Sequence, residues 1–440
     1  MAEAIRLNMP PRLQSFFLFC GVAYIAIYTL EGMVRYGLSF AGADSAILAR
    51  DLLMWLPLLA LLMHQSFRQK VELPFLVYAA VIAIHGGIIY LNFRTTIPVI
   101  YGAKLLINIL FGFVAGAILT HPSRRVLRVF IFLWFTGVIG LMLEKFFFSM
   151  PWVGMSASIG GITVDVARNW DIVDPLAKRV AGFTRSSISA AAVFPILALI
   201  IAVRTRSWML KAFVLLVTAG AVFATTQKGS LVAFMVVLAI LLAPKRWHVT
   251  LLRITCLAFV LLLVALPIVT PGLMMTTGGG VFSMMSFAMR FQLTWPEAWS
   301  WVSGNEVFPF GVGLGGIGGP QRFFAPDFFN PSDNLFVFMY ANFGVLAFVY
   351  LGAICTIIFR IPRRPPPEAM GALATLTFLM GYGAVLSMIE DQMSALFIGA
   401  AAGVLWQMRV RHNIVKQQDV LEPQGKAVVL APAYARQSTR

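Results

Sequence analysis

Twelve apolar stretches follow one another along the chain, and they constrain its fold more than any other feature. A helix of about 20 apolar residues is long enough to cross the hydrocarbon core of a bilayer. The chain is 59% hydrophobic and 12% charged, and a soluble protein of 440 residues could not bury that much apolar surface. We therefore predict an all-α integral membrane protein with about 12 transmembrane helices. The expected spans are 15–30, 46–63, 73–91, 97–119, 126–145, 185–203, 208–225, 230–243, 250–270, 334–359, 369–388 and 392–408.

Basic residues occur in every second connection between these spans. If the N-terminus is cytoplasmic, the cytoplasmic segments carry 22 of the 34 Lys and Arg residues but only 5 of the 18 Asp and Glu residues. This distribution follows the positive-inside rule and predicts that both termini are cytoplasmic. The net charge of +16 is then a topology signal that also suits anionic membrane lipids. No nucleic-acid partner is expected.

We predict one polytopic membrane domain, 1–410, followed by a polar tail, 411–440, that is disordered in the cytosol. Two connections on the opposite side are long, 146–184 and 271–333, and long loops in compact proteins tend to be functional. The second contains Trp295, Trp299 and Trp301. Such a density of aromatic residues suits a helix in the lipid interface. A lid packed on the spans beneath explains it equally well.

Charged side chains at or below the lipid headgroups are costly unless they are paired or hydrated, so they are candidates for function. Six of them are expected on the side away from the cytoplasm. They are Lys104, Arg179, Arg185, Lys228, Arg290 and Asp333.

Several of these cations could act together. Lys228 lies in a tight turn, Arg179 and Arg185 flank Gly182-Phe183, and Arg290 lies in an amphipathic stretch. Arginine binds phosphate groups bidentately and lysine binds them as a point charge, so a cluster of these cations would suit a pyrophosphate. Each also has a simpler explanation: a snorkelling lysine, a helix-end anchor, or contact with lipid phosphates.

Asp333 opens the tenth span, followed by Asn334. An Asp that follows proline and serine at the start of a helix is typical of an N-cap. Alternatively, a carboxylate at the membrane edge beside cations could accept a proton from a substrate hydroxyl.

The glycine run at 311–316 matches a dinucleotide-binding fingerprint by its letters alone. It follows no predicted strand and opens no βαβ unit, so we interpret it as a loop that packs closely against another element. The three cysteines lie within spans and have no zinc-type spacing. Neither a metal nor another cofactor is expected.

With these residues in view, the chain resembles the O-antigen ligase and Wzy-type polysaccharide polymerase superfamily over roughly residues 175–360. Two residues depart from the ligase pattern. Lys228 occupies a position where ligases usually carry arginine, and Asp333 occupies a position where they carry histidine. The aspartate favours the polymerases. The matching stretches are the Arg–Gly–Phe lead-in at 179–187, the turn at 226–229, the arginine and glycine-rich stretch at 290–315, and the Asp–Asn opening at 333–344.

The resemblance implies a GT-C-like glycosyltransferase of the bacterial inner membrane, with its active site at the periplasmic face. Such an enzyme would polymerise undecaprenyl-pyrophosphate-linked repeat units without metal and with inversion. Lys228, Arg290 and one of Arg179 or Arg185 would bind the pyrophosphate, and Asp333 would accept the proton or orient the hydroxyl. Asn334 and Lys104 are secondary candidates. The alternatives are a ligase that transfers the glycan to lipid A core and a transporter of such lipids. Membrane lipids and chain-length regulators or export proteins are further expected partners.

Overall fold

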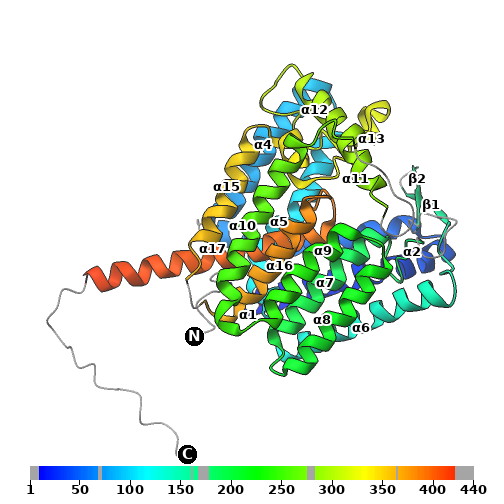
Figure 1. Cartoon of the computed structure of the whole chain (residues 1–440). Coiled ribbons are helices and arrows are strands. Elements are labelled where there is room, and N and C mark those ends of the chain that lie inside the picture. Colours follow the sequence, from blue (N-terminus) through cyan, green and yellow to red (C-terminus); the bar gives the residue numbers. More distant parts are fainter. Residues whose placement is uncertain are drawn as a thin grey trace, which may run out of the picture.

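A computed structural model describes residues 9–67, 72–159, 162–166, 178–274, 283–362 and 365–421. It is built almost entirely of helices (Figure 1). The helices of the first half are α1 Pro11–Thr29, α2 Glu31–Phe40, η2 Asp44–Leu48, α3 Ala49–Phe67, α4 Leu73–Phe93, α5 Ile97–Thr120, α6 Arg124–Phe146, α7 Ser187–Arg204 and α8 Trp208–Ala224. Those of the second half are α9 Lys228–Leu242, η3 Lys245–Trp247, α10 His248–Val269, α11 Met285–Met289, η4 Arg290–Thr294, α12 Trp295–Ser303, α13 Gln321–Phe324, η5 Pro326–Phe328, α14 Leu335–Phe343, α15 Leu346–Phe359, α16 Pro367–Gly383 and α17 Gln392–Leu421.

The helices confirm a multi-pass membrane architecture. Within the described residues, seven helices are long and apolar enough to cross a bilayer, and four shorter apolar helices accompany them. The prediction of an all-α protein needs one small correction, because the loop after α6 contains an antiparallel pair of strands, β1 Ser156–Ile159 and β2 Ile162–Asp165.

Eleven of the predicted spans each correspond to one helix. The predicted span 334–359 is instead two helices, α14 and α15, because the chain turns at Gly344, whose φ is +56°. A side chain there would collide with the backbone of Phe310 at 2.2 Å. Helix α2 was not predicted. Helix α17 continues to Leu421, into the predicted tail, and residues 422–440 lie outside the described part.

Close packing of α5 against α17 anchors the C-terminal part of the bundle. Gly112 and Gly116 on α5 pack against the backbone of α17, and Gly399 and Gly403 on α17 pack against the backbone of α5. In each pair, three residues separate the two glycines. A Cβ at Gly112 would lie 1.9 Å from the Leu396 carbonyl oxygen, and one at Gly399 would lie 2.0 Å from that of Ile109. Small residues at this spacing let helix backbones approach closely, which drives helix association within bilayers.

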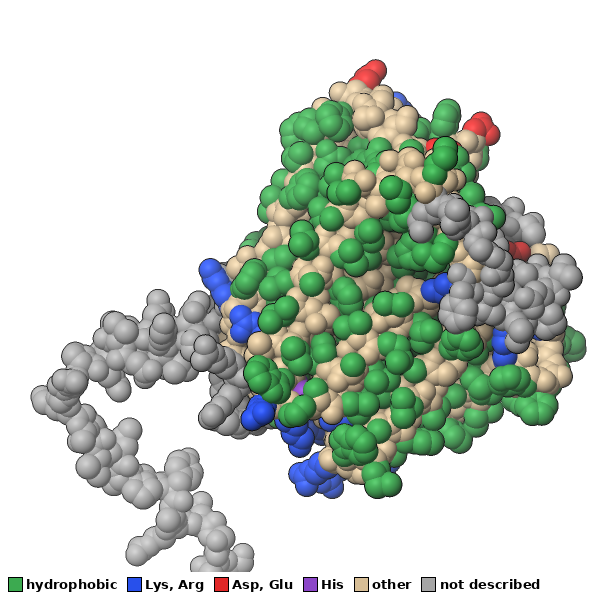
Figure 2. All heavy atoms as spheres, in the orientation of Figure 1, with side chains coloured by type: hydrophobic (Ala, Val, Ile, Leu, Met, Phe, Trp, Pro, Cys, Tyr) green, Lys and Arg blue, Asp and Glu red, His purple; other side chains and the backbone are tan. Residues whose placement is uncertain are grey.

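Helix α7 lies at the centre of the bundle, with every residue from Ser189 to Ile201 buried. The outer helices carry the exposed apolar side chains, among them Trp208, Met209 and Phe213 on α8. Figure 2 shows apolar side chains spread over this surface, with most visible Lys and Arg at its lower and left edges and Asp and Glu at its top. An exposed apolar belt between charged ends is what a bilayer-embedded protein requires.

The segments after α10 form a cap over one end of the bundle, near the labels α12 and α13 in Figure 1. The predicted close packing of the glycine run is confirmed within this cap. Gly313, with a φ of +103°, lies so close to α4 that a Cβ would be 2.4 Å from the Ile89 nitrogen. The adjacent Gly315 nitrogen donates to Asn342 of α14 at 2.6 Å. The cap is thereby fixed to α4 and α14, two helices that lie far apart in sequence.

Candidate active site

The structure brings Asp333 and Arg290 into direct contact. The Arg290 Nη2 atom lies 3.1 Å from the Asp333 Oδ2 atom, and 16% and 26% of the two side chains remain exposed. Burial raises the pKa of Asp333, and the nearby Arg290 and Arg179 lower it only in part. A solvent-accessible carboxylate that is easier to protonate than usual is suited to accept a proton from a hydroxyl.

The backbone before α14 holds this carboxylate in place. Ser332 and Asp333 both have positive φ values, +58° and +43°, a conformation that is costly for residues other than glycine. The helix cap is Asn334, whose side-chain oxygen accepts from the Phe336 and Val337 nitrogens at 2.7 and 3.0 Å. Capping therefore does not explain Asp333, and its carboxylate is directed to Arg290.

Asn334 itself is structural. Its Nδ2 atom donates to the carbonyl oxygens of Leu263 and Ala384, each at 3.0 Å, and the side chain is fully buried. The amide therefore fastens the start of α14 to α10 and to the end of α16. A direct contact with substrate would break these bonds.

Arg290 begins the π-helical turn η4, which directs its side chain towards Asp333. Its Nη1 atom donates to the Ser286 carbonyl oxygen at 3.1 Å, and its guanidinium lies 5.9 Å from the Phe287 ring centroid. The buried Nε atom has no hydrogen-bond partner among the described residues. π-turns are frequent at functional sites, and the Nε–H group of Arg290 could still donate a hydrogen bond. This arginine could therefore bind a ligand.

Arg179 joins the same cluster from the loop before α7. The loop is held by Glu144 of α6, which accepts from the nitrogens of Ala181 and Gly182 at 2.9 and 2.5 Å. Gly182 has a φ of +61°, and a Cβ there would lie 2.8 Å from the Leu141 nitrogen. Burial lowers the pKa of Arg179, and the charge of Arg290 lowers it further. The Arg–Gly–Phe pattern thus places a guanidinium beside a second one.

Lys228 is the first residue of α9, and its ammonium donates to the Ser283 carbonyl oxygen. It lies close enough to Arg179 for the two charges to interact. Gly229 permits this position, since a Cβ there would lie 2.1 Å from a methyl group of Val385. The N-terminus of a helix carries a partial positive charge, which favours anions and disfavours cations. Lys228 and the N-terminus of α9 therefore both attract negative charge.

We call Arg179, Lys228, Arg290 and Asp333 the cationic cluster. It contains three basic groups and one carboxylate. They come from the loop before α7, the first residue of α9, the first residue of η4 and the segment before α14. The structure therefore brings together four of the predicted residues. Three basic groups in one place suit the negative charge of a pyrophosphate.

Tyr382 and Glu390 belong to the same region and were not predicted. Tyr382, at the end of α16, is buried within range of the charges of Asp391, Arg290, Asp333 and Arg179, and its hydroxyl has no partner within the described residues. Glu390 accepts from the Gly319 nitrogen and the Ser387 hydroxyl, both at 2.6 Å. Burial raises the pKa of Glu390. Glu390 could have been predicted, because it is an acidic residue between two apolar stretches. Tyr382 could not, because a tyrosine within a span is usually a packing residue.

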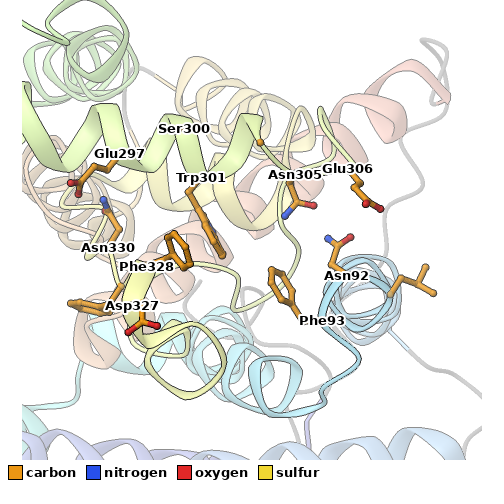
Figure 3. Close-up of a pocket in the computed structure, with 13 residues that line it drawn as sticks. Asn92, Phe93, Glu297, Ser300, Trp301, Asn305, Glu306, Asp327, Phe328 and Asn330 are labelled. Carbon is orange, nitrogen blue, oxygen red and sulfur yellow. The ribbon is translucent and has the colours of Figure 1, made fainter.

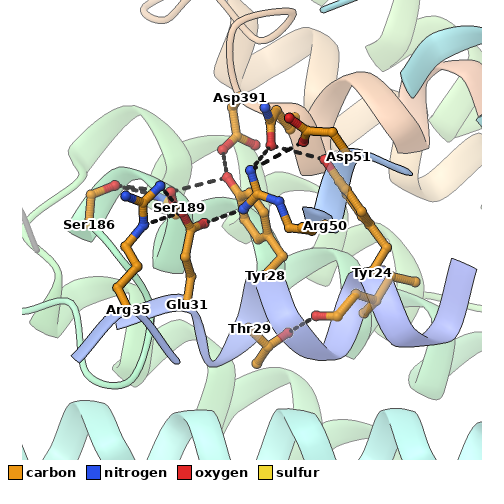
Figure 4. Close-up of polar contacts among 12 residues, drawn as sticks. Tyr24, Tyr28, Thr29, Glu31, Arg35, Arg50, Asp51, Ser186, Ser189 and Asp391 are labelled. Carbon is orange, nitrogen blue, oxygen red and sulfur yellow. Dashed lines mark hydrogen bonds and ion pairs between the residues drawn. The ribbon is translucent and has the colours of Figure 1, made fainter. Parts of the chain in front are cut away.

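Lys104 and Arg185 do not join the cationic cluster. Lys104 pairs with Asp51 at 2.6 Å, and Arg185 lies near Glu31 and Arg35. Both lie at a second polar region around α1, α2, α3 and the start of α17, and Figure 4 displays its central residues Tyr28, Glu31, Arg35, Arg50, Asp51 and Asp391. We call it the Glu31 network and define it by Glu31, Arg35, Arg50, Asp51, Lys104, Arg185, Tyr28 and Asp391.

The Glu31 network is closely paired. The Glu31 carboxylate accepts from Arg35 Nε at 2.8 Å and Arg50 Nη1 at 2.7 Å (Figure 4). Tyr28 donates to Asp391, which also accepts from Ser394. Burial raises the pKa of Glu31, but the adjacent Arg50, Arg35 and Arg185 outweigh it and bring the value to about 2. The buried charge of Glu31 is tolerated because two arginines are paired with it.

The three tryptophans of the cap face the protein, which favours a lid over a helix lying in the lipid interface. Trp295 is fully buried. Trp299 donates from its indole nitrogen to the Pro267 carbonyl oxygen at 2.8 Å, and Trp301 donates to that of Gly316 at 2.9 Å. The first bond fixes α12 to α10, and the second fixes it to the glycine run within the cap.

No family model, curated protein or solved structure matches this chain. Function must therefore be inferred from the geometry of the cationic cluster and from the motifs that carry the resemblance.

Proposed function

We propose that this protein is a membrane glycosyltransferase that polymerises undecaprenyl-pyrophosphate-linked oligosaccharide units. The observation that carries the proposal is the cationic cluster: three basic side chains together with a carboxylate that contacts Arg290. A transfer of this type releases a pyrophosphate and removes a proton from an acceptor hydroxyl. The cluster has groups for both tasks.

In the proposed mechanism, Arg179, Lys228 and Arg290 bind the pyrophosphate. Negative charge increases on this leaving group in the transition state, so cations fixed in advance lower the barrier selectively. The C–O bond to the pyrophosphate breaks as the acceptor oxygen forms the new bond from the opposite face of the anomeric carbon. This sequence inverts the configuration.

Asp333 accepts the proton of the acceptor hydroxyl. Its contact with Arg290 couples the two halves of the reaction, because the arginine can turn towards the leaving group while the carboxylate takes up the proton. The Tyr382 hydroxyl, which has no partner among the described residues, would donate to a pyrophosphate oxygen. No step requires a metal or another cofactor.

The proposed setting is the bacterial inner membrane, with 12 spans in a GT-C-like arrangement, cytoplasmic termini and the cluster at the periplasmic face. The distribution of basic residues supports this orientation. The segregation of Lys and Arg from Asp and Glu in Figure 2 supports it too. At that face the substrate must arrive already activated, which agrees with a lipid pyrophosphate donor.

The direct test incubates the purified protein in liposomes with lipid-linked repeat units. Longer glycans that remain on the carrier lipid are the expected product. Transfer to lipid A core instead would identify a ligase, and movement of the lipid across the bilayer without a new glycosidic bond would identify a transporter. Either of these results would overturn the proposal.

A further inference from the structure

We propose that a pocket beside the cationic cluster binds the glycan of the substrate and selects against acidic sugars. The pocket lies between the end of α4, helix α12 and η5, and its volume is about 640 Å³ (Figure 3). The inference rests on the proposed function, because it assigns the pocket to the saccharide part of the same substrate.

The pocket and the cluster share the same chain segments. Glu297, Ser300 and Trp301 line the pocket from α12, which directly follows the turn that contains Arg290. Residues 327–330 line it from the other side and lead to Asp333. Asn330 joins the two segments, because its Nδ2 atom donates to the Thr294 carbonyl oxygen at 2.8 Å. A glycan attached at the cluster could therefore extend into the pocket along these segments.

The aromatic side of the pocket is preformed. Trp301 is fixed by its bond to Gly316 and stacks against Phe93 and Phe328, with centroid distances of 5.9 and 5.4 Å. These three rings extend from α4 to η5 along the pocket (Figure 3). A rigid row of aromatic rings is a surface on which the apolar C–H faces of sugar rings can lie without a large entropic cost.

The polar side is acidic. Glu297, Glu306 and Asp327 line the pocket, and none of them has a hydrogen bond or ion pair within the described part of the chain. No Lys or Arg is among the lining residues. Three free carboxylates accept hydrogen bonds from sugar hydroxyls, and these charge-assisted bonds are stronger than neutral ones. The same charges repel uronic acids and other anionic sugars.

A metal ion does not explain the carboxylates. Within the described residues, no three His, Cys, Asp or Glu side chains lie close enough to hold one. The carboxylates are instead distributed around the pocket (Figure 3), a spacing that suits several separate hydroxyl or amino groups on one ligand. The structure therefore favours a neutral or amino-sugar oligosaccharide.

Binding to the full-length protein in nanodiscs tests this inference without requiring catalysis. The probes are cellotetraose, which is neutral, chitosan tetraose, which is cationic, and tetragalacturonate, which is anionic. Saturation-transfer NMR and calorimetry should detect the first two but not the third. The triple variant Glu297→Gln, Glu306→Gln, Asp327→Asn should bind chitosan tetraose at least tenfold more weakly and gain affinity for tetragalacturonate.

Two controls define the result. Glu368→Gln, which removes a carboxylate from the start of α16, should leave binding unchanged. Arg290→Ala should also leave it unchanged, because these probes carry no pyrophosphate, so a failure of glycan transfer would be distinguishable from a failure of the pocket. The inference is overturned if neither the neutral nor the cationic probe binds, if tetragalacturonate binds equally well, or if the triple variant matches the parent protein.

Discussion

The cationic cluster and the Glu31 network are both polar, partly or fully buried, and adjacent, but they are organised in opposite ways. In the network, Glu31 is 3% exposed and is paired with two arginines. In the cluster, three cations lie together with one carboxylate, and the nearby Tyr382 hydroxyl has no partner among the described residues. A region whose carboxylates are paired with neighbouring cations stabilises the protein, whereas three cations with a single carboxylate suit an anionic ligand.

This contrast separates residues that look alike in the sequence. Arg179 and Arg185 lie six residues apart in one loop, yet the first belongs to the cluster and the second to the network. Mutations in the two regions should therefore have different signatures, one in glycan transfer and the other in folding.

The largest effect on transfer is expected for Asp333→Asn. Loss of a general base lowers rates by roughly 100- to 10,000-fold, and Asn334 still caps α14, so the melting temperature should change little. Transfer would be measured from lipid-linked repeat units, and unfolding by fluorescence-detected thermal shift. A variant that polymerises at the parent rate would remove Asp333 from the mechanism.

The largest effect on stability is expected for Glu31→Gln. Removal of one partner from a buried ion pair costs about 3–5 kcal/mol, and here it leaves Arg35 and Arg50 without their carboxylate. Adding Arg35→Met should restore part of the loss, which a double-mutant cycle on the free energy of unfolding would detect. If Glu31→Gln unfolds like the parent protein, the network does not stabilise the fold.

The pH dependence of the two regions should also differ. The pKa of Glu31 is lowered to about 2, so its contribution to stability is present at neutral pH and is lost as the pH falls from about 4.5 towards 2. Burial raises the pKa of Asp333, so the rate of transfer should begin to fall at a higher pH than the stability does. Below the pKa of Asp333, the rate should fall about tenfold for each pH unit. Asp333→Asn should lack this acidic limb, and a limb that persists would contradict its assignment.

A smaller effect is expected for Tyr382→Phe. A buried hydroxyl without a partner costs about 1–3 kcal/mol, so its removal should raise stability by about 1 kcal/mol. If the hydroxyl donates to the pyrophosphate, the same change should lower transfer roughly tenfold, corresponding to about 1.4 kcal/mol. Equal or higher transfer would show that Tyr382 is only a packing residue.

The sequence was sufficient to predict the apolar helices, since hydropathy over about 20 residues carries that information directly. It also singled out Arg179, Lys228, Arg290 and Asp333, because uncompensated charges at the ends of apolar spans are unusual. It did not predict the break at Gly344, which depends on the close approach of Phe310 from a distant segment.

The rest of the site depends on the paths of loops. Gly182 turns the chain so that Arg179 and Arg185 reach different regions, and no local pattern specifies that outcome. Asn334 caps α14, so the Asp333 carboxylate is not used as a helix cap. Only the backbone geometry shows which of these two neighbouring residues is the cap. The spacing of Glu31 and Arg35 by four residues is one at which an ion pair can form on a helix. The sequence did not show that the pair is buried.

The most direct test of the account is a cryo-electron microscopy structure of the protein with undecaprenyl pyrophosphate in nanodiscs. We predict phosphate density within hydrogen-bond distance of Arg179, Lys228 and Arg290, with Asp333 beside it and the Glu31 network unchanged. Phosphate density among Arg35, Arg50 and Arg185, with the cationic cluster empty, would contradict the account.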